Sequence, residues 1–248
     1  NGGLVVMDVS DPTNLTWAGS YNTSGYAYGV AVAGNYAYIA NDYNGGLVVV
    51  DVSDPTNPIK VGTYHTDGYT SGVAVADGYA YIADYNGGLV VVDVNDPANP
   101  TYAGSYDLYD WDGAFGNGQT AISVAVAGEY AYVADARGGL VVVNISDPTN
   151  PTYTGGYDSS SFALGVAVSG DYAYVADYSG DSGLVVLDVS DPTDPTMVGS
   201  YDNLNYAKGV AVSGDYAYVA DDDGLVVMDV SVPMDPTMVG NWDINYGD

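Results

Sequence analysis

The sequence predicts an all-β fold, and three observations lead to this prediction. Short runs rich in Val, Tyr, Ile and Thr alternate with Gly, Asn, Asp and Pro along the 248 residues, as strands alternate with turns. No stretch shows the spacing of an amphipathic helix. The phrase "YAYIADYNGGLVVVDVNDP" at 79–97 also has close counterparts at 36–55, 130–148, 172–192 and 216–233.

Two markers set the phase of this repeat. From the Leu of each "GLVV" to the next first Val of "VAV" the interval is 26 residues, except for a third interval of 35. The nine extra residues lie in "DLYDWDGAFGNGQT" at 107–120. The markers are Leu4, Leu47, Leu89, Leu140, Leu184 and Leu225, and Val30, Val73, Val124, Val166 and Val210. We expect one domain over 1–248, with units at 1–25 (a half), 26–68, 69–119, 120–161, 162–205 and 206–248.

Each complete unit contains four strand-like pieces joined by turn sequences such as "DG", "DYNGG" and "NDPANP". The third piece, "LVVVDV" at 89–94, is apolar on both faces, whereas a sandwich strand alternates apolar with polar residues. A small sheet covered on both sides by similar sheets accounts for this, and a parallel β-helix does so less well. The predicted fold is a β-propeller of four-stranded antiparallel blades with about six repeats, five complete and one half.

The half repeat leaves one inner hairpin unaccounted for. The sequence begins in the loop before a third strand, and a further interval of 26 after Leu225 would place the next first-strand Val at 251. Unpaired backbone groups at an inner edge are normally covered. Three outcomes are therefore expected as alternatives: the polypeptide continues past one end, a neighbouring chain supplies the strands, or the ring closes tightly over the half-blade.

The charge and the basic residues limit the function. Three Lys and Arg against 32 Asp and Glu give a net charge of −29, which disfavours nucleic acid and anionic membranes. The chain has no Cys and no apolar run long enough for a membrane span. His65 is the only histidine, so a multi-histidine metal site cannot form within one chain. With only Lys60, Arg137 and Lys208 as further basic side chains, we expect a protein that is not an enzyme.

Calcium is the one candidate cofactor, because clustered carboxylates offer the oxygen ligands that Ca²⁺ prefers. The loops "ADYSGDSG" (176–183) and "ADDDG" (220–224) are the best candidates, although no spaced calcium-loop motif is present. The alternative is that these residues cap hairpin turns. The candidate ligands are Asp177, Asp181, Asp221, Asp222 and Asp223.

Aromatic residues are concentrated in two kinds of connector, between strands two and three and between one blade and the next. In an antiparallel blade both connectors emerge on the same face, where aromatic rings beside Asp and Asn suit sugar binding. Packing between neighbouring loops is the alternative. The candidate ligand-binding residues are Tyr43, Tyr85, Tyr109, Trp111, Phe115 and Tyr178. We also expect removal of 110–118 to leave the fold intact and to impair binding or assembly.

Units that carry "GLVVVDVSDPTNP" after "GVAV…YAYIAD" resemble LVIVD repeats over essentially the whole chain. The resemblance implies a β-propeller at the cell surface or outside the cell in bacteria or archaea, and it supplies no catalytic residues. We therefore expect a non-catalytic structural or interaction protein, for instance a subunit of a fibre, sheath or surface layer. Its partners would be proteins, including further copies that associate through the incomplete blade. The alternatives are a carbohydrate-binding propeller that also takes glycans as partners and, less favoured, a polysaccharide lyase or hydrolase.

Overall fold

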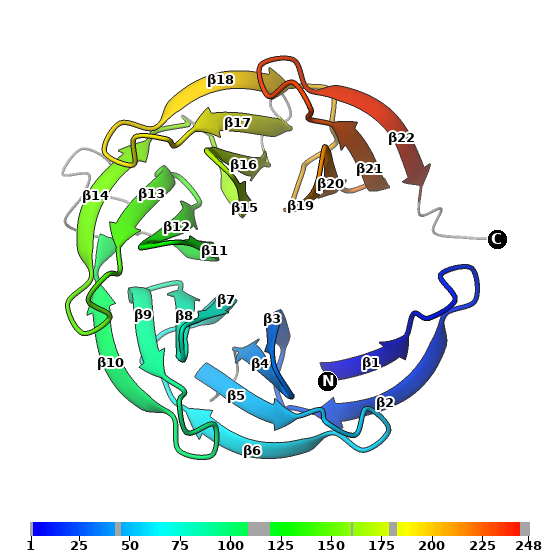
Figure 1. The fold of residues 1–248 in the computed structure, drawn as a ribbon, viewed down its shortest axis with the longest axis vertical. Coiled ribbons are helices and arrows are strands. Elements are labelled where there is room, and N and C mark those ends of the chain that lie inside the picture. Colours follow the sequence, from blue (N-terminus) through cyan, green and yellow to red (C-terminus); the bar gives the residue numbers. More distant parts are fainter. Residues whose placement is uncertain (1, 43–45, 109–119, 160, 179–182, 244–248) are drawn as a thin grey trace.

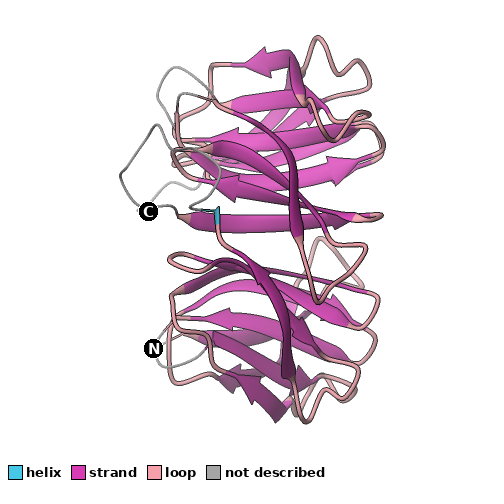
Figure 2. Ribbon diagram, turned by 90° about the vertical axis from the view of Figure 1, so that its left-hand side faces the viewer, coloured by secondary structure: helices cyan, strands magenta, loops and turns pink. Residues whose placement is uncertain are grey.

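The computed structural model describes residues 2–42, 46–108, 120–159, 161–178 and 183–243. Within them the chain forms 22 strands in five four-stranded sheets and one two-stranded sheet, arranged around a ring (Figure 1). Seen from the side, the connections between strands lie on two opposite faces of the ring (Figure 2). The predicted β-propeller of five complete repeats and one half is confirmed.

In each sheet the strands lie side by side in the order in which they occur in the chain, and every neighbouring pair is antiparallel. The half-blade consists of β1 (Gly3–Asp8) and β2 (Thr16–Asn22). The first blade contains β3 (Ala27–Ala33), β4 (Tyr36–Asn41), β5 (Gly46–Asp51) and β6 (Ile59–Tyr64), and the second β7 (Thr70–Ala76), β8 (Tyr79–Asp84), β9 (Gly88–Asp93) and β10 (Thr101–Tyr106). The third contains β11 (Ala121–Ala127), β12 (Tyr130–Asp135), β13 (Gly139–Asn144) and β14 (Thr152–Tyr157). The fourth contains β15 (Ala163–Ser169), β16 (Tyr172–Asp177), β17 (Leu184–Asp188) and β18 (Thr196–Tyr201), and the fifth β19 (Gly209–Ser213), β20 (Tyr216–Ala220), β21 (Gly224–Asp229) and β22 (Thr237–Asp243).

The turn sequences form the turns that they predict. Between β7 and β8, Gly78 has a φ of 81°, a left-handed conformation that residues with a Cβ rarely adopt. Between β5 and β6, the Asp54 carboxylate accepts hydrogen bonds from the Thr56 amide at 3.0 Å and the Thr56 hydroxyl at 2.7 Å. This Asp-Pro-Thr turn ends the pairing of one strand and starts the next.

The hydrophobic core lies between blades, which explains why the third strand is apolar on both faces. In β9, Leu89 and Val91 pack in a cluster with residues of the third blade. The alternate residues Val90 and Val92 pack in a separate cluster with the first blade. One strand therefore contributes to two cores, because successive side chains point to opposite faces of a sheet.

The second tyrosine of each "YAY" is a core residue in the first four blades. Tyr81 is 3% exposed and packs at the junction with the third blade. Burial raises its pKa to about 12, because the phenolate form is poorly solvated there. A large ring thus fills the space between sheets while its hydroxyl stays protonated.

The half-blade packs on the first blade and leaves the ring open on its other side. Leu4 and Tyr21 contact a buried cluster of Ile39, Val48 and Val50 in the first blade. Within the described chain, β1 pairs with β2 alone. Tight closure of the ring over the half-blade, one of the three expected outcomes, is therefore not observed. No helix among the described residues has the length and apolar character to cross a membrane.

Candidate functional site

The junction between the fifth blade and the half-blade differs from every other junction in the ring. At the five other junctions, apolar side chains of both sheets form a common cluster. No such cluster among the described residues joins the fifth blade to the half-blade, and the two are separated in Figure 1. We call this place the open junction; it is bordered by Val5, Met7, Val30, Val32, Tyr218 and Leu225.

The fifth blade forms one wall of the open junction. Tyr218 is 37% exposed, whereas Tyr81 at the same place in the second blade is 3% exposed. Leu225 is 38% exposed, whereas its counterpart Leu89 is completely buried. Because the sequence around these residues is nearly the same, their exposure comes from the missing neighbour.

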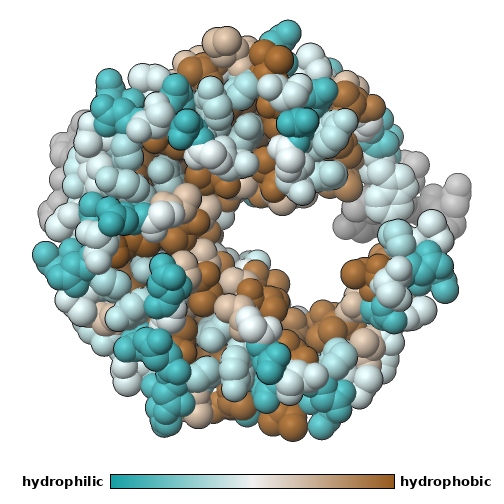
Figure 3. All heavy atoms as spheres, in the orientation of Figure 1, coloured by the Kyte–Doolittle hydropathy of each residue, from teal (hydrophilic) through white to brown (hydrophobic). Residues whose placement is uncertain are grey.

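The first blade and the half-blade form the opposite wall. Val30 in β3 is 55% exposed, compared with 9% for Val73 at the same position in the second blade. The two strands of the half-blade cover the outer part of the first blade and leave Val30 and Val32 of β3 exposed. Val5 and Met7 of β1 are also exposed. Hydrophobic residues accordingly border the central opening in Figure 3.

A pocket on the connector face brings tyrosines of two blades together. Tyr28, Tyr69 and Tyr85 line a cavity of about 460 Å³, together with Asp42, Thr70, Ser71 and Ile122. The Tyr85 amide donates a hydrogen bond to the Tyr69 carbonyl at 2.8 Å, so the two kinds of connector lie side by side. This contact places both connectors on one face, as expected.

The polar groups of this pocket are mostly engaged in holding the blades. The Thr70 hydroxyl donates to the Asn41 carbonyl at 3.0 Å, and the Ser71 hydroxyl donates to the Ala121 carbonyl at 2.8 Å. Oδ1 of Asp42 is buried and has no hydrogen-bond partner among the described residues. The pocket thus offers exposed tyrosine rings, which suit the C–H groups of a sugar, whereas the unsatisfied oxygen of Asp42 is buried.

The other predicted aromatic residues divide into two groups. Tyr178 packs against Tyr206 of the next connector, with ring centroids 4.9 Å apart. The Arg137 guanidinium lies 5.5 Å from the centre of the Phe162 ring. In this part of the face the rings contact neighbouring loops, as the packing alternative expects. Tyr43, Tyr109, Trp111 and Phe115 lie outside the described residues, and so does the 110–118 segment.

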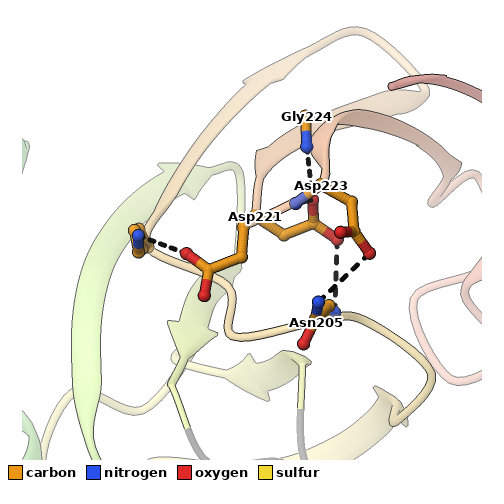
Figure 4. Close-up of polar contacts among 6 residues, drawn as sticks. Asn205, Asp221, Asp223 and Gly224 are labelled. Carbon is orange, nitrogen blue, oxygen red and sulfur yellow. Dashed lines mark hydrogen bonds and ion pairs between the residues drawn. The ribbon is translucent and has the colours of Figure 1, made fainter. Parts of the chain in front are cut away.

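The acidic loop after β20 uses its carboxylates to hold the neighbouring connector. Oδ1 of Asp221 accepts hydrogen bonds from the amides of Asp223 at 3.0 Å and Gly224 at 2.9 Å. Asn205 lies below Asp221 and Asp223 in Figure 4 and donates its backbone amide to Asp221 and its side-chain Nδ2 to Asp223. The remaining carboxylate, Asp222, forms an ion pair with Lys208.

The aspartate that ends the second strand has a similar role in the second, third and fourth blades. Asp135 accepts the Thr120 amide at 2.9 Å, Asp84 accepts the Gly68 amide at 3.2 Å, and Asp177 accepts the Ser161 hydroxyl. Asp181 lies outside the described residues. Among the residues that the structure describes, no group of three or more His, Asp or Glu is placed to hold a metal ion. Calcium binding at these loops stays a prediction.

His65 is exposed on a connector. Together with Asp67 and Asp84 it lines a pocket with a volume of about 470 Å³. Within the described part of the chain, no hydroxyl side chain forms a hydrogen bond with its imidazole. The arrangement lacks the linked nucleophile and base of a Ser-His-Asp site.

Comparison with known families explains the regularity of the sheets. A model of the LVIVD repeat matches residues 1–23, 24–66, 67–108, 118–159, 162–203 and 205–244. The chain belongs to the LVIVD-repeat family. Each LVIVD match contains one sheet of the ring, and the first match contains the two strands of the half-blade. Among curated proteins, none matches the sequence of this LVIVD-repeat chain.

Solved structures resemble the LVIVD-repeat ring at low sequence identity. A protein of unknown function from Desulfotomaculum acetoxidans is 14% identical, with a TM-score of 0.73 over 90% of this chain and 72% of the other. BamB from Moraxella catarrhalis is 15% identical, with a TM-score of 0.61 over 92% and 65%. A "putative 6-phosphogluconolactonase" from Bacteroides fragilis is 14% identical, with a TM-score of 0.75 over 91% and 72%. At such identities the similarity shows the propeller fold alone.

Sequence reasoning did not select all the residues of these sites. Tyr28, Tyr69 and Asp42 line the pocket with Tyr85. Tyr69 and Asp42 lie in connectors that share one face, which was their signal, whereas Tyr28 lies near the start of β3. Val30 and Tyr218 carry no local signal, because buried counterparts in other blades have nearly the same sequence context.

Proposed function

We propose that this chain is a non-catalytic interaction protein of the cell surface or cell exterior, and that it serves as a subunit of a fibre, sheath or surface layer. Its copies associate through the open junction. The observation that carries the proposal is the contrast between five closed junctions and one whose apolar walls are exposed. Contiguous exposed apolar surface on a folded protein marks an interaction site.

The backbone of β1 supports the same proposal. Its strand partner is β2 on one side, and the described chain offers none on the other. Unpaired N–H and C=O groups along an edge invite a strand from another polypeptide, and backbone hydrogen bonds then add to the contact of apolar side chains. The net charge of −29 opposes unspecific association, so contact is favoured where apolar surface is concentrated.

Sedimentation velocity over a range of protein concentrations tests the proposal. We expect the native chain to form larger species as concentration rises, and Val32→Asp to stay monomeric because it places a carboxylate in the open junction. Ile59→Asp is the matched control, since Ile59 on β6 is 56% exposed and Val32 is 66% exposed. A native chain that remains monomeric, or an Ile59→Asp variant that loses association equally, contradicts the proposal.

Carbohydrate binding is a second candidate function, carried by the tyrosine pocket. Three exposed tyrosines and Asp42 line one cavity. Sugar rings stack on aromatic faces through their C–H groups, while a carboxylate oxygen accepts hydrogen bonds from their hydroxyls.

A glycan array followed by calorimetry tests this second candidate. For any glycan that binds, Tyr69→Ala and Tyr85→Ala should each weaken the affinity about tenfold or more, as expected for a stacking aromatic residue. Tyr206→Ala is the control, because Tyr206 packs against Tyr178 instead of lining this pocket. An array without a binding glycan, or equal losses in all three variants, removes the candidate.

A further inference from the structure

The aromatic ring in the connector between two blades has a different neighbour at each junction. Tyr69, Phe162 and Tyr206 all stand four residues before the first Val of "VAV". The Phe162 ring lies 5.5 Å from the Arg137 guanidinium, and the Tyr206 ring packs against Tyr178 with the centroids 4.9 Å apart. In both cases a side chain of the preceding blade covers part of the ring.

At Tyr69 the preceding blade supplies a carboxylate. Asp42 stands four residues after the second tyrosine of "YAY", which is the place of Tyr178 in the fourth blade. Tyr69 is 59% exposed, compared with 41% for Tyr206. A negative charge therefore lies beside an aromatic ring at the cavity that Tyr28 and Tyr85 also line.

The cations of the chain itself show which chemistry these two positions attract. The ring position holds a guanidinium at Phe162. The carboxylate position holds an ammonium in the fifth blade, where Asp222 stands four residues after the second tyrosine of "YAY" and pairs with Lys208. The cavity at Tyr69 and Asp42 combines both positions.

Among the residues that the structure describes, no basic side chain lines this cavity. Arg137 and Lys208 are engaged elsewhere, and Lys60 lies on the outer strand β6. The one histidine, His65, lines a different pocket. A cation at Tyr69 and Asp42 would therefore come from another molecule, and the net charge of −29 attracts cations to this chain.

The lining favours a cation without N–H groups. The Thr70 and Ser71 hydroxyls donate to backbone carbonyls, and Oδ1 of Asp42 is buried. An ammonium or guanidinium would give up hydration here and find few acceptors in exchange. A trimethylammonium group has no N–H, and its methyl groups carry the positive charge onto the faces of aromatic rings.

We propose that the cavity lined by Tyr28, Tyr69, Tyr85 and Asp42 binds a trimethylammonium group, such as that of choline. The tyrosine faces contact the methyl groups, and Asp42 supplies the opposite charge. The volume of about 460 Å³ also leaves room for the short chain attached to the nitrogen. This proposal does not depend on self-association, and it competes with carbohydrate binding for the same cavity.

Calorimetric titration of the native chain with choline chloride, at constant ionic strength, tests the proposal. Two matched ligands separate charge from shape. The neutral carbon analogue of choline has a tert-butyl group in place of trimethylammonium, and ethanolamine keeps the charge but replaces the methyl groups with N–H. We expect saturable choline binding at one site, and binding of each matched ligand that is about tenfold weaker or more.

Variants assign the binding to this cavity. Asp42→Asn and Tyr69→Leu should each weaken choline binding about threefold or more, because they remove a charge and a ring face. Tyr69→Phe should bind choline better than Tyr69→Leu, since Phe162 at the same position of the repeat holds a guanidinium. Asp222→Asn is the matched control and should bind like the native chain, because Asp222 lies outside the cavity. Circular dichroism checks that each variant is folded.

Phosphocholine distinguishes two sources of the same group. Binding equal to that of choline would assign the site to the phosphocholine head group of a lipid or glycan. Weaker binding, which we expect because the phosphate adds negative charge beside Asp42, would assign it to a free cation.

Several results would overturn the proposal. They are no choline binding, equal binding of choline and its neutral analogue, equal binding of choline and ethanolamine, or native affinity in both Asp42→Asn and Tyr69→Leu. A chain that self-associates and does not bind choline would retain the proposed function and remove this site. A monomeric chain that binds choline would retain the site and remove the proposed function.

Discussion

Aspartate has two structural roles in this chain, and its place in the repeat decides between them. Asp54 is exposed in a turn and accepts two hydrogen bonds from Thr56, which together hold the pKa of its carboxyl below the ordinary value. Asp84 is buried at the end of a strand and accepts an amide from the connector of the preceding blade. The first role shapes a hairpin, and the second holds two loops together.

Because of the turn aspartates, we expect the free energy of unfolding to fall in acid. Because the folded pKa of Asp54 is below the ordinary value of 3.8, its hydrogen bonds stabilise the fold fully above that pH. This stabilisation is lost when the carboxylate becomes protonated, as the pH falls from about 4 to below the pKa of the folded state. Asn144 stands at the place of Asp51 in the third blade and accepts hydrogen bonds from the amide and hydroxyl of Ser146, which shows that an asparagine can accept bonds of this kind without a titratable group. Asp54→Asn should therefore fold normally and be less sensitive to acid.

Urea unfolding at pH values from 6 to 3 measures this effect. The difference in midpoint between the native chain and Asp54→Asn should be constant down to about pH 4 and should then change in favour of the variant. A difference that does not vary with pH would show that the turn carboxylate contributes no proton-linked stability.

At the scale of the element, burial depends on what covers a strand more than on its sequence. The "GLVV" strands β9 and β21 have nearly the same residues, yet Leu89 is completely buried and Leu225 is 38% exposed. Each sheet is too thin to bury its own side chains, so the neighbouring sheet completes its core. The last blade on an open side therefore shows what every blade would expose alone.

This contrast predicts unequal costs for the same substitution. Leu89→Ala removes a fully buried side chain from a packed cluster and should lower the free energy of unfolding by about 2–5 kcal/mol. Leu225→Ala should cost well under half as much, because its side chain already contacts solvent. Chemical denaturation of both variants measures the difference, and equal costs would show that the open junction is covered in solution.

At the scale of the whole molecule, charge opposes the compaction that the repeats favour. The net charge is −29, because three Lys and Arg stand against 32 Asp and Glu, and Lys208 forms an ion pair with Asp222. Repulsion between carboxylates spread around a ring is long-ranged, and salt screens it over a distance of about 8–10 Å at physiological strength. Stability should therefore rise with ionic strength.

A comparison of Ca²⁺ with NaCl distinguishes general screening of the negative charge from specific binding of the cation. We expect Ca²⁺ to raise the melting temperature more than NaCl of matched ionic strength, if carboxylates of the "ADYSGDSG" or "ADDDG" loops hold the ion. Asp222→Asn, which removes the partner of Lys208, is the first variant to compare. Equal effects of the two salts would assign the loops to hydrogen bonding between connectors alone.

The location of much of the candidate site could be predicted from the sequence, but the residues that come together there could not. The phase of the markers indicated where a hairpin is lacking, and the strand order indicated that the aromatic connectors share a face. Which rings converge depends on blade twist and loop path, so Tyr85 joins Tyr28 and Tyr69 in a pocket while Tyr178 packs on Tyr206. The hydrogen bonds that occupy Asp221 and Asp223 likewise depend on Asn205, which is distant in the chain.

The sequence by itself determined the strands, the turns and the number of repeats, because each rests on residues that are neighbours in the chain: β-branched pairs, Asp-Pro turns and left-handed glycines. Only the tertiary structure decided which identical residues are buried. Val30 and Val73 have the same local pattern, and so do Gly62 and Gly240, yet one of each pair is covered and the other is not. The reason is that a blade buries its faces against other blades, and the open junction has no sheet to complete it.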